Sequence, residues 1–367
     1  MERLQSTYEH QVDFNLSESG VHPLTLAELI PDRASRDALL AESLRYTQTN
    51  GSIPLRESIA AFYPGATADH VQVTNGGAEA NYITTWNLIA PGDDVVMMVP
   101  NFMQVWGLAR AFGATLNAWP LIESGDAEWR LDTDALERLV SARTRLIVIC
   151  NPNNPTGARF DAGALDRIAA IADRHGSWII SDEIYRGAER DGRETPTMWG
   201  RSERVMVTSG LAKAYGLPGL RIGWIVGPSA RMESLWSYHD YTTIAPGALN
   251  DALARRALEP ATRDRLLART RDILNRNYPI IAGWLDSHGA MFHYAPPDAG
   301  AIVYTRYRHT INSTALVTRM RVEKGVLIVP GDHFGMDGYL RIGFGDQLDR
   351  LRQGLTHLHD LLCSISS

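Results

Sequence analysis

Short apolar runs alternate with amphipathic stretches through the middle of the chain, and this alternation constrains the fold more than any other feature. The apolar runs are continuous, as in strands that are buried on both faces of a sheet. Strand–helix alternation favours an α/β unit with a mostly parallel sheet, because parallel strands need long crossover connections. We expect strands at residues 94–99, 115–119, 145–150, 178–181, 205–208 and 222–226, and helices at 77–89, 105–112, 133–142 and 162–175.

The pattern changes near residue 261, which indicates a second, smaller α+β unit. The length of 367 residues also exceeds that of one ordinary domain. We predict a large domain at 45–260 and a small domain formed by both chain ends, 1–44 and 261–367. The elements expected after residue 261 are a helix at 262–288, strands at 301–305, 325–329 and 339–342, and helices at 313–324 and 347–362.

The composition excludes several classes of function. The net charge is -6 and no run of basic residues is present, so we expect neither nucleic acid nor a membrane as a partner. No apolar run reaches the roughly 20 residues that span a bilayer, and the first residues lack the apolar core of a secretory signal. Two cysteines, Cys150 and Cys363, suggest no disulfide framework, which favours a cytoplasmic location. The histidines show no metal-ligand spacing, so we expect no metal site.

Lysine is scarce in this chain. Lysine and arginine total 36, yet lysine occurs only at positions 213 and 324. Arginine replaces lysine wherever only a positive charge is needed, so a lysine that remains is more often needed as an amine. Lys324 precedes Gly325 at an expected helix end, where a cation suits the helix dipole. Lys213 has no such structural reason, and we therefore expect a chemical role for its amine.

Several motifs follow one another in a characteristic order. The loop at 151–157, N-P-N-N-P-T-G, follows one expected strand, and S-D-E-I-Y at 181–185 follows the next. The carboxyl ends of such strands are where open α/β sheets bind ligands. In the segment 209–224, Arg221 follows Lys213 by eight positions. These motifs, with Y-x(4)-G-x(4)-R starting at Tyr46, resemble those of the class I/II aminotransferases. Members of that family are fold type I enzymes, like aspartate aminotransferase, and depend on pyridoxal 5′-phosphate (PLP).

The resemblance implies a role for each residue that would face the PLP ring. Lys213 would carry PLP as a Schiff base and move a proton during catalysis. Asp182 would pair with the pyridine nitrogen and keep the ring an electron sink, whereas its neighbour Glu183 is expected to make structural contacts. Asn154 and Tyr185 would hydrogen-bond the phenolic oxygen. The catalytic candidates are therefore Lys213, Asp182 and Tyr185.

The resemblance also implies a phosphate site. Gly76, Gly77 and Ala78 open an expected helix, whose first N–H groups suit a phosphate. Arg221 would grip the phosphate with its planar guanidinium. Family members usually have Ser or Thr in place of Ala78 and Ser at position 210, where this chain has glycine, so two phosphate hydroxyls are missing. Ser209 is a candidate to replace one of them.

Four other positions complete the expected site. Phe102 would stack on the pyridine ring, although such a residue is as often part of a core. Tyr46 would reach the PLP phosphate of a neighbouring subunit, which implies a homodimer with shared active sites. Arg341 would clamp the substrate α-carboxylate, with Asn154 beside it. Gly20, in the N-terminal loop at 17–22, would offer the substrate a backbone contact.

The motifs leave the reaction open. Transamination of an α-amino acid, with a keto acid as acceptor, is favoured by the complete set of ring partners and would place the chain in amino-acid metabolism. Elimination, replacement or cyclisation would use the same residues, and the N-terminal S-E-S-G-V-H and the G-L-A-K segment also resemble capreomycidine synthase-type PLP cyclases. A non-catalytic PLP-fold binding protein is disfavoured, because the lysine is present and no segment is left for a DNA-binding module.

Overall fold

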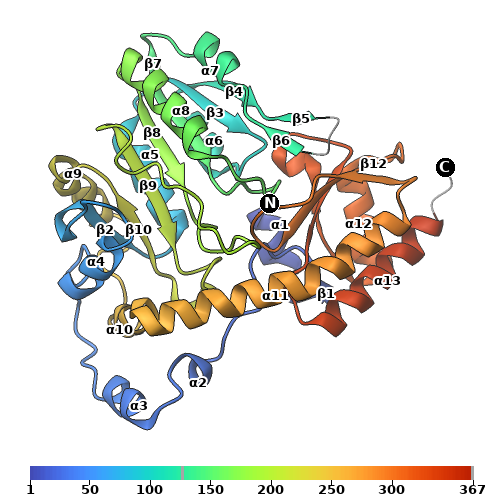
Figure 1. Cartoon of the computed structure of the whole chain (residues 1–367), viewed down its shortest axis with the longest axis horizontal. Helices are drawn as coiled ribbons and strands as arrows, with labels where there is room; N and C mark the ends of the chain where they lie inside the picture. Colours follow the sequence, from blue (N-terminus) through green and yellow to red (C-terminus); the bar gives the residue numbers. More distant parts are fainter. Residues whose placement is uncertain (125–127, 365–367) are drawn as a thin grey trace.

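A seven-stranded sheet forms the centre of the computed structural model, which describes residues 1–124 and 128–364 (Figure 1). The strand order is β2-β10-β9-β8-β7-β3-β4, and only β10 runs antiparallel to its neighbours. The mostly parallel sheet expected from the apolar runs is therefore confirmed. Its strands are β2 (Val71–Thr74), β3 (Asp94–Val99), β4 (Thr115–Pro120), β7 (Thr144–Cys150), β8 (Trp178–Asp182), β9 (Val205–Gly210) and β10 (Gly223–Val226).

Helices cover both faces of this sheet. In β3, Val95 and Met97 belong to a core shared with α5, α6 and α9, whereas Val96 and Met98 belong to a core shared with α4, α7 and α8. Successive residues of a strand point to opposite faces, so a continuous apolar run serves both cores. The helices are α4 (Ile53–Ala60), α5 (Gly77–Leu88), α6 (Gln104–Ala111), α7 (Thr133–Leu139), α8 (Ala162–His175) and α9 (Ser229–His239).

A smaller α+β unit is formed by both chain ends, as expected. Its antiparallel sheet has the order β11-β12-β15-β14, and β1 pairs in parallel with β13 beside it. The prediction of one strand at 325–329 is wrong. The segment forms two strands, because β13 pairs with β1 while β14 pairs with β15. The elements are β1 (Phe14–Asn15), β11 (Phe292–Tyr294), β12 (Ile302–Tyr307), α12 (Ser313–Lys324), β13 (Val326–Leu327), β14 (Val329–Pro330), β15 (Tyr339–Gly343) and α13 (Leu348–Ser364).

The long helix α11 (Pro260–Ser287) links the two units (Figure 1). It contacts α10 (Ala248–Leu258) near its start, and β11 and α13 in the smaller unit. The domain boundaries near residues 45 and 261 stay a prediction. The described residues contain no helix that is long and apolar enough to cross a membrane.

The remaining elements lie at the edges of the two units. Figure 1 shows α2 and α3 standing away from the body of the molecule, in the chain segment before α4. These elements are α1 (Glu2–Tyr8), α2 (Leu26–Leu29), α3 (Arg33–Leu40), the paired strands β5 (Ile122–Ser124) and β6 (Glu128–Arg130), and the 3-10 turns η1 (Ala68–His70), η2 (Pro218–Leu220) and η3 (Gly331–Phe334).

Candidate active site

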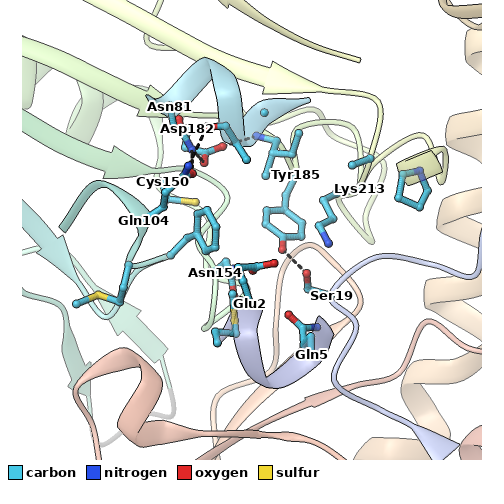
Figure 2. A pocket seen from close by; sticks show the side chains of 18 of the residues that line it. Glu2, Gln5, Ser19, Asn81, Gln104, Cys150, Asn154, Asp182, Tyr185 and Lys213 are labelled. Carbon is cyan, nitrogen blue, oxygen red and sulfur yellow. Dashed lines mark hydrogen bonds between the residues drawn. The ribbon is translucent and has the colours of Figure 1, made fainter. Parts of the chain in front are cut away.

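A cavity of about 550 Å³ lies where the carboxyl ends of β7 and β8 meet the start of α5. Parallel strands present their carboxyl ends at one edge of the sheet, which is why side chains from separate motifs converge there. Figure 2 shows Lys213 and Tyr185 directed toward the same space, with Glu2 and Gln5 approaching from α1. Eight residues proposed from the sequence line this cavity: Gly77, Ala78, Phe102, Asn154, Asp182, Tyr185, Lys213 and Arg221.

Asp182 is the last residue of β8, and its carboxylate is held in place by two donors. Asn81 of α5 donates through Nδ2 to Oδ2 at 3.1 Å, and the backbone N–H of Ile184 donates to Oδ1 at 3.1 Å. The hydroxyl of Thr208 donates to Asn81 Oδ1 at 2.7 Å and so orients the amide. Burial raises the pKa of Asp182, and the hydrogen bond from Asn81 opposes this shift.

Sequence reasoning missed Asn81. The available signal was its position on α5, one turn after the glycine pair that opens this helix. Residues four apart lie on the same helix face, so a polar residue at position 81 was placed to face the strand ends.

The N-terminal loop lies against Lys213. Lys213 Nζ is 3.6 Å from Glu18 Oε2, an ion pair at the edge of the cavity. A Cβ on Gly20 would lie 3.4 Å from Lys213 Cδ, so Gly20 is a close neighbour of the lysine, as its proposed substrate contact requires. The Tyr185 hydroxyl donates to Ser19 Oγ at 2.8 Å, and burial raises the pKa of this tyrosine. Glu18 and Ser19 had no recognised role in the sequence motifs.

Arg341 in β15 is 1 % exposed and pairs with two segments distant in sequence. Nη1 donates to Asn154 Oδ1 at 2.8 Å, and Nη2 donates to the carbonyl oxygen of Ser17 at 2.6 Å. Its Nε is buried and has no hydrogen-bond partner within the described ranges. Burial lowers the pKa of Arg341, while the nearby Tyr185 and Glu18 raise it. A buried guanidinium whose contacts are neutral favours an anionic ligand.

The turn before α5 and the Arg221 side chain form a cup at one end of the cavity. Gly76 has φ +93°, and a Cβ there would lie 2.2 Å from Arg221 Nη2, so glycine lets the guanidinium approach the backbone. Arg221 itself has the left-handed φ of +47°, and its Nη1 donates to the carbonyl oxygen of Pro218 at 3.1 Å. The free N–H groups at the start of α5 and the guanidinium suit a phosphate.

The structure explains one departure from the family pattern. A Cβ at Gly210 would lie 2.8 Å from the carbonyl oxygen of Ile222, so a serine does not fit there without a shift of the backbone. The Ser209 hydroxyl donates to the carbonyl oxygen of Glu183 at 3.2 Å, and Ser209 is not among the described residues that line the cavity. Its proposed contact with a phosphate has no geometric support in this conformation.

Tyr46 is 80 % exposed and lies outside the cavity of its own chain. Its exposure is compatible with a contact to a second subunit. The fold alone does not bring it to the site.

Glu183, beside Asp182, is buried and serves the local structure. Its Oε1 accepts from the backbone N–H of Met198 at 2.8 Å and from the Thr197 hydroxyl at 3.0 Å, while Oε2 is buried with no partner in the described part of the chain. Burial raises its pKa from 4.5 to about 7. The folded state therefore binds a proton more readily than the unfolded state between these pH values, so stability falls as the pH rises through this window.

We expect Glu183→Gln to stabilise the protein at pH 8. The raised pKa of Glu183 means that ionising its carboxyl above pH 7 costs the wild-type protein about 3 kcal/mol of folding free energy. A neutral amide does not ionise and so avoids this loss of stability. Urea denaturation at pH 5 and pH 8 should show a much weaker pH dependence for the variant than for the wild type. Glu323→Gln, which breaks an exposed pair with Arg319, is the matched control and should leave the pH dependence unchanged. An equal pH dependence in wild type and Glu183→Gln would contradict the assignment.

Fold and site together define a class of protein. A mostly parallel sheet whose carboxyl edge brings together a lysine, a buried carboxylate and an arginine at a helix N-terminus is the arrangement of a PLP-dependent fold type I enzyme. The family model for aminotransferases of class I and II matches residues 23–358. The chain belongs to this family, and PLP is its cofactor.

Individual relatives agree with this assignment. The chain is 32 % identical to capreomycidine synthase of Streptomyces vinaceus over 359 residues, which cover 96 % of this chain and 90 % of that protein. The crystal structure of a PLP-dependent aminotransferase from Streptococcus suis superimposes with a TM-score of 0.92 and 29 % identity, over 100 % of this chain and 97 % of the other. The PLP-dependent cyclase OrfR gives a TM-score of 0.88 and 26 % identity, over 98 % and 96 %. The chain is a PLP-dependent transferase of the aminotransferase type, with a cyclase among its relatives.

Proposed function

We propose that this enzyme transfers the amino group of an α-amino acid to a keto acid, and that Lys213 attaches the cofactor and moves the proton. The observation that carries the proposal is the convergence of Lys213, Asp182 and Arg221 on one cavity beside the buried Arg341. When bound, PLP supplies an electron sink that labilises the bonds at the substrate Cα.

The residues around the cavity fit PLP. Asp182 presents a carboxylate fixed by Asn81, and its burial strengthens an interaction with a protonated ring nitrogen. Arg221 and the N–H groups of Gly77 and Ala78 would hold the phosphate at one end of this cavity. Tyr185, Asn154 and Phe102 complete the lining on the phenolic and ring faces.

The substrate carboxylate fits Arg341. Its guanidinium is rigidly held by Asn154 and by the Ser17 carbonyl, which orients a planar donor for a planar acceptor. The loop from Ser17 to Gly20 contacts Arg341 through the Ser17 carbonyl and lies against Lys213 at Gly20, so it joins the proposed carboxylate site to the lysine. Lys213 is then positioned to remove and return the Cα proton.

A homodimer with shared active sites is part of this proposal. Large apolar side chains stand exposed on the segment that contains Tyr46 and on the loop after α9, among them Leu40, Leu44 and Tyr241. A subunit interface that covers these side chains would remove their apolar surface from water. The two cysteines are unpaired, in keeping with a cytoplasmic location.

Sedimentation at assay concentration should give twice the chain mass of 40.6 kDa. Leu44→Glu is expected to shift the equilibrium toward monomer, because it places a charge on the proposed interface. Val322→Glu is the matched control: Val322 is also exposed but lies on α12, and this change should leave the mass unaltered. A wild-type monomer with full activity would exclude shared sites.

A half-reaction tests the reaction type. Incubated with one amino acid and no acceptor, the enzyme should release one keto acid per site without free ammonia, and the cofactor absorbance should change to that of its amine form. Adding a keto acid should restore the original absorbance. Repeated turnover of the amino acid without an acceptor would favour the second candidate below.

The second candidate is elimination, replacement or cyclisation of the amino-acid side chain. The similarity to capreomycidine synthase and to the cyclase OrfR is the observation that favours it. The same residues would serve both reactions, and the acceptor requirement separates them.

A further inference from the structure

A buried carboxylate stands behind the phosphate cup and takes no part in the roles proposed above. Glu79, in the first turn of α5, has a side chain that is 8 % exposed, and it faces the completely buried His239. Its Oε2 accepts from the backbone N–H of Asn75 at 2.5 Å. Its Oε1 accepts from the Thr243 hydroxyl at 2.7 Å and from the Thr242 hydroxyl, and lies 3.2 Å from His239 Nδ1.

This set of donors keeps Glu79 charged. Burial alone would raise its pKa, but the hydrogen bonds from His239, Thr242 and the Asn75 N–H outweigh burial and hold the pKa at about 2. The carboxylate is therefore a permanent acceptor at neutral pH, and each bond to it is charge-assisted.

The residues at 242–245, here called the strap, are tied to the cup a second time. Asn75 Nδ2 donates to Thr243 Oγ1 at 2.6 Å and to the carbonyl oxygen of Ala245 at 3.1 Å. Between these two residues, Ile244 has φ +68°, a conformation that β-branched side chains rarely adopt. Such backbone persists only where surrounding contacts determine it, and contacts to Asn75 and Glu79 flank it on the strap.

Asn75 connects this cluster to the cup itself. Its N–H is bound by Glu79, while its carbonyl oxygen accepts from Arg221 Nη2 at 3.5 Å. Gly76 follows immediately and leads into Gly77 and Ala78, which carry the N–H groups proposed to hold the phosphate. The direction in which this turn points is thus decided by the Glu79 carboxylate on one side and by Arg221 on the other.

We propose that Glu79 is a positioning residue that fixes the phosphate-binding turn against the strap, so that the affinity for PLP depends on it although it does not touch the phosphate. The proposal rests on the phosphate site of the proposed function. The chain lacks the hydroxyls usual at positions 78 and 210, which leaves backbone N–H groups to do more of the binding, and these groups bind only when correctly oriented.

Binding of PLP and of pyridoxal, which lacks the phosphate, separates positioning from general damage. We expect Glu79→Gln to weaken PLP binding about ten- to hundredfold, as for the loss of a charge-assisted hydrogen bond, and to leave pyridoxal binding within about twofold of wild type. The amide places an NH₂ group where an oxygen now accepts from a donor. The measurement is a titration of cofactor-free protein with each compound, followed by absorbance.

If Glu79→Gln folds poorly, Thr243→Val is the second test variant, because valine keeps the shape of the threonine side chain. The change removes the hydrogen bond that Thr243 donates to Glu79 and the one that it accepts from Asn75. It should weaken PLP binding selectively, by a smaller factor. Glu323→Gln, on the exposed surface of α12, is the control and should change neither affinity.

The variant Arg221→Ala tests the phosphate site itself, so its result separates an error about Glu79 from an error about that site. If Arg221→Ala weakens PLP binding while Glu79→Gln and Thr243→Val do not, the role of Glu79 is overturned and the phosphate site stands. If Arg221→Ala also leaves PLP affinity unchanged, the phosphate site itself is wrong. A parallel loss of PLP and pyridoxal affinity in Glu79→Gln would show a general structural role and would overturn the inference.

Discussion

Lys213→Arg should lower kcat by about four orders of magnitude, the largest effect that we expect from a single replacement. Arginine keeps the positive charge beside Glu18 but stays protonated at all working pH values, so it supplies neither a nucleophilic amine nor a proton acceptor. The variant should still bind PLP through the phosphate cup. Single-turnover release of keto acid from a good amino-acid substrate measures the loss.

The other lysine provides a matched control for this replacement. Lys324 is the last residue of α12, and Gly325 after it has a left-handed φ of +64°. A positive charge at a helix C-terminus is favoured by the helix dipole, so Lys324 needs no catalytic role to account for it. Lys324→Arg should therefore leave kcat within about twofold of wild type. Borohydride reduction of the holoenzyme should label Lys213 alone. A label on Lys324, or substantial activity in Lys213→Arg, would contradict the assignment of Lys213 as the residue that attaches PLP and moves the proton.

Arg341→Gln should lower kcat/KM for α-amino acids by about a hundred- to a thousandfold. The guanidinium is buried and fixed by Asn154 and by the Ser17 carbonyl, so the replacement deletes a preorganised, charged donor pair for the substrate carboxylate. Truncating one member of a buried charge pair costs about 2–5 kcal/mol. Most of the effect should appear in KM, because the carboxylate binds in ground state and transition state alike.

Two comparisons make this prediction specific. Arg341→Lys keeps the charge and loses the bidentate geometry, so it should fall between wild type and Arg341→Gln. Arg319→Gln, at an exposed ion pair on α12, should have no effect. If Arg341→Gln slows the reaction of a simple primary amine as much as that of an amino acid, then Arg341 supports the fold and does not bind the carboxylate.

Elements with strong local signals were predictable from the sequence alone. The helix α8 begins and ends at the expected residues, because Asp161 caps its first turn and Gly176 ends it in the left-handed conformation. The strand β3 coincides with the predicted apolar run at 94–99, because that signal also lies within a few consecutive residues. The split into β13 and β14 was not predictable, since it depends on which distant strands pair with each piece.

The amino-acid sequence by itself determined the class of the enzyme, its cofactor and the motifs at the strand ends, because each motif is short and its backbone geometry is local. Tertiary structure alone decided which polar side chains meet. Asn81 reaches Asp182 across 101 positions, Arg341 reaches Asn154 across 187, and Glu18 comes to Lys213 from the N-terminal segment. Such contacts depend on how elements that are distant in sequence pack together, and packing is a property of the whole chain that no local pattern records.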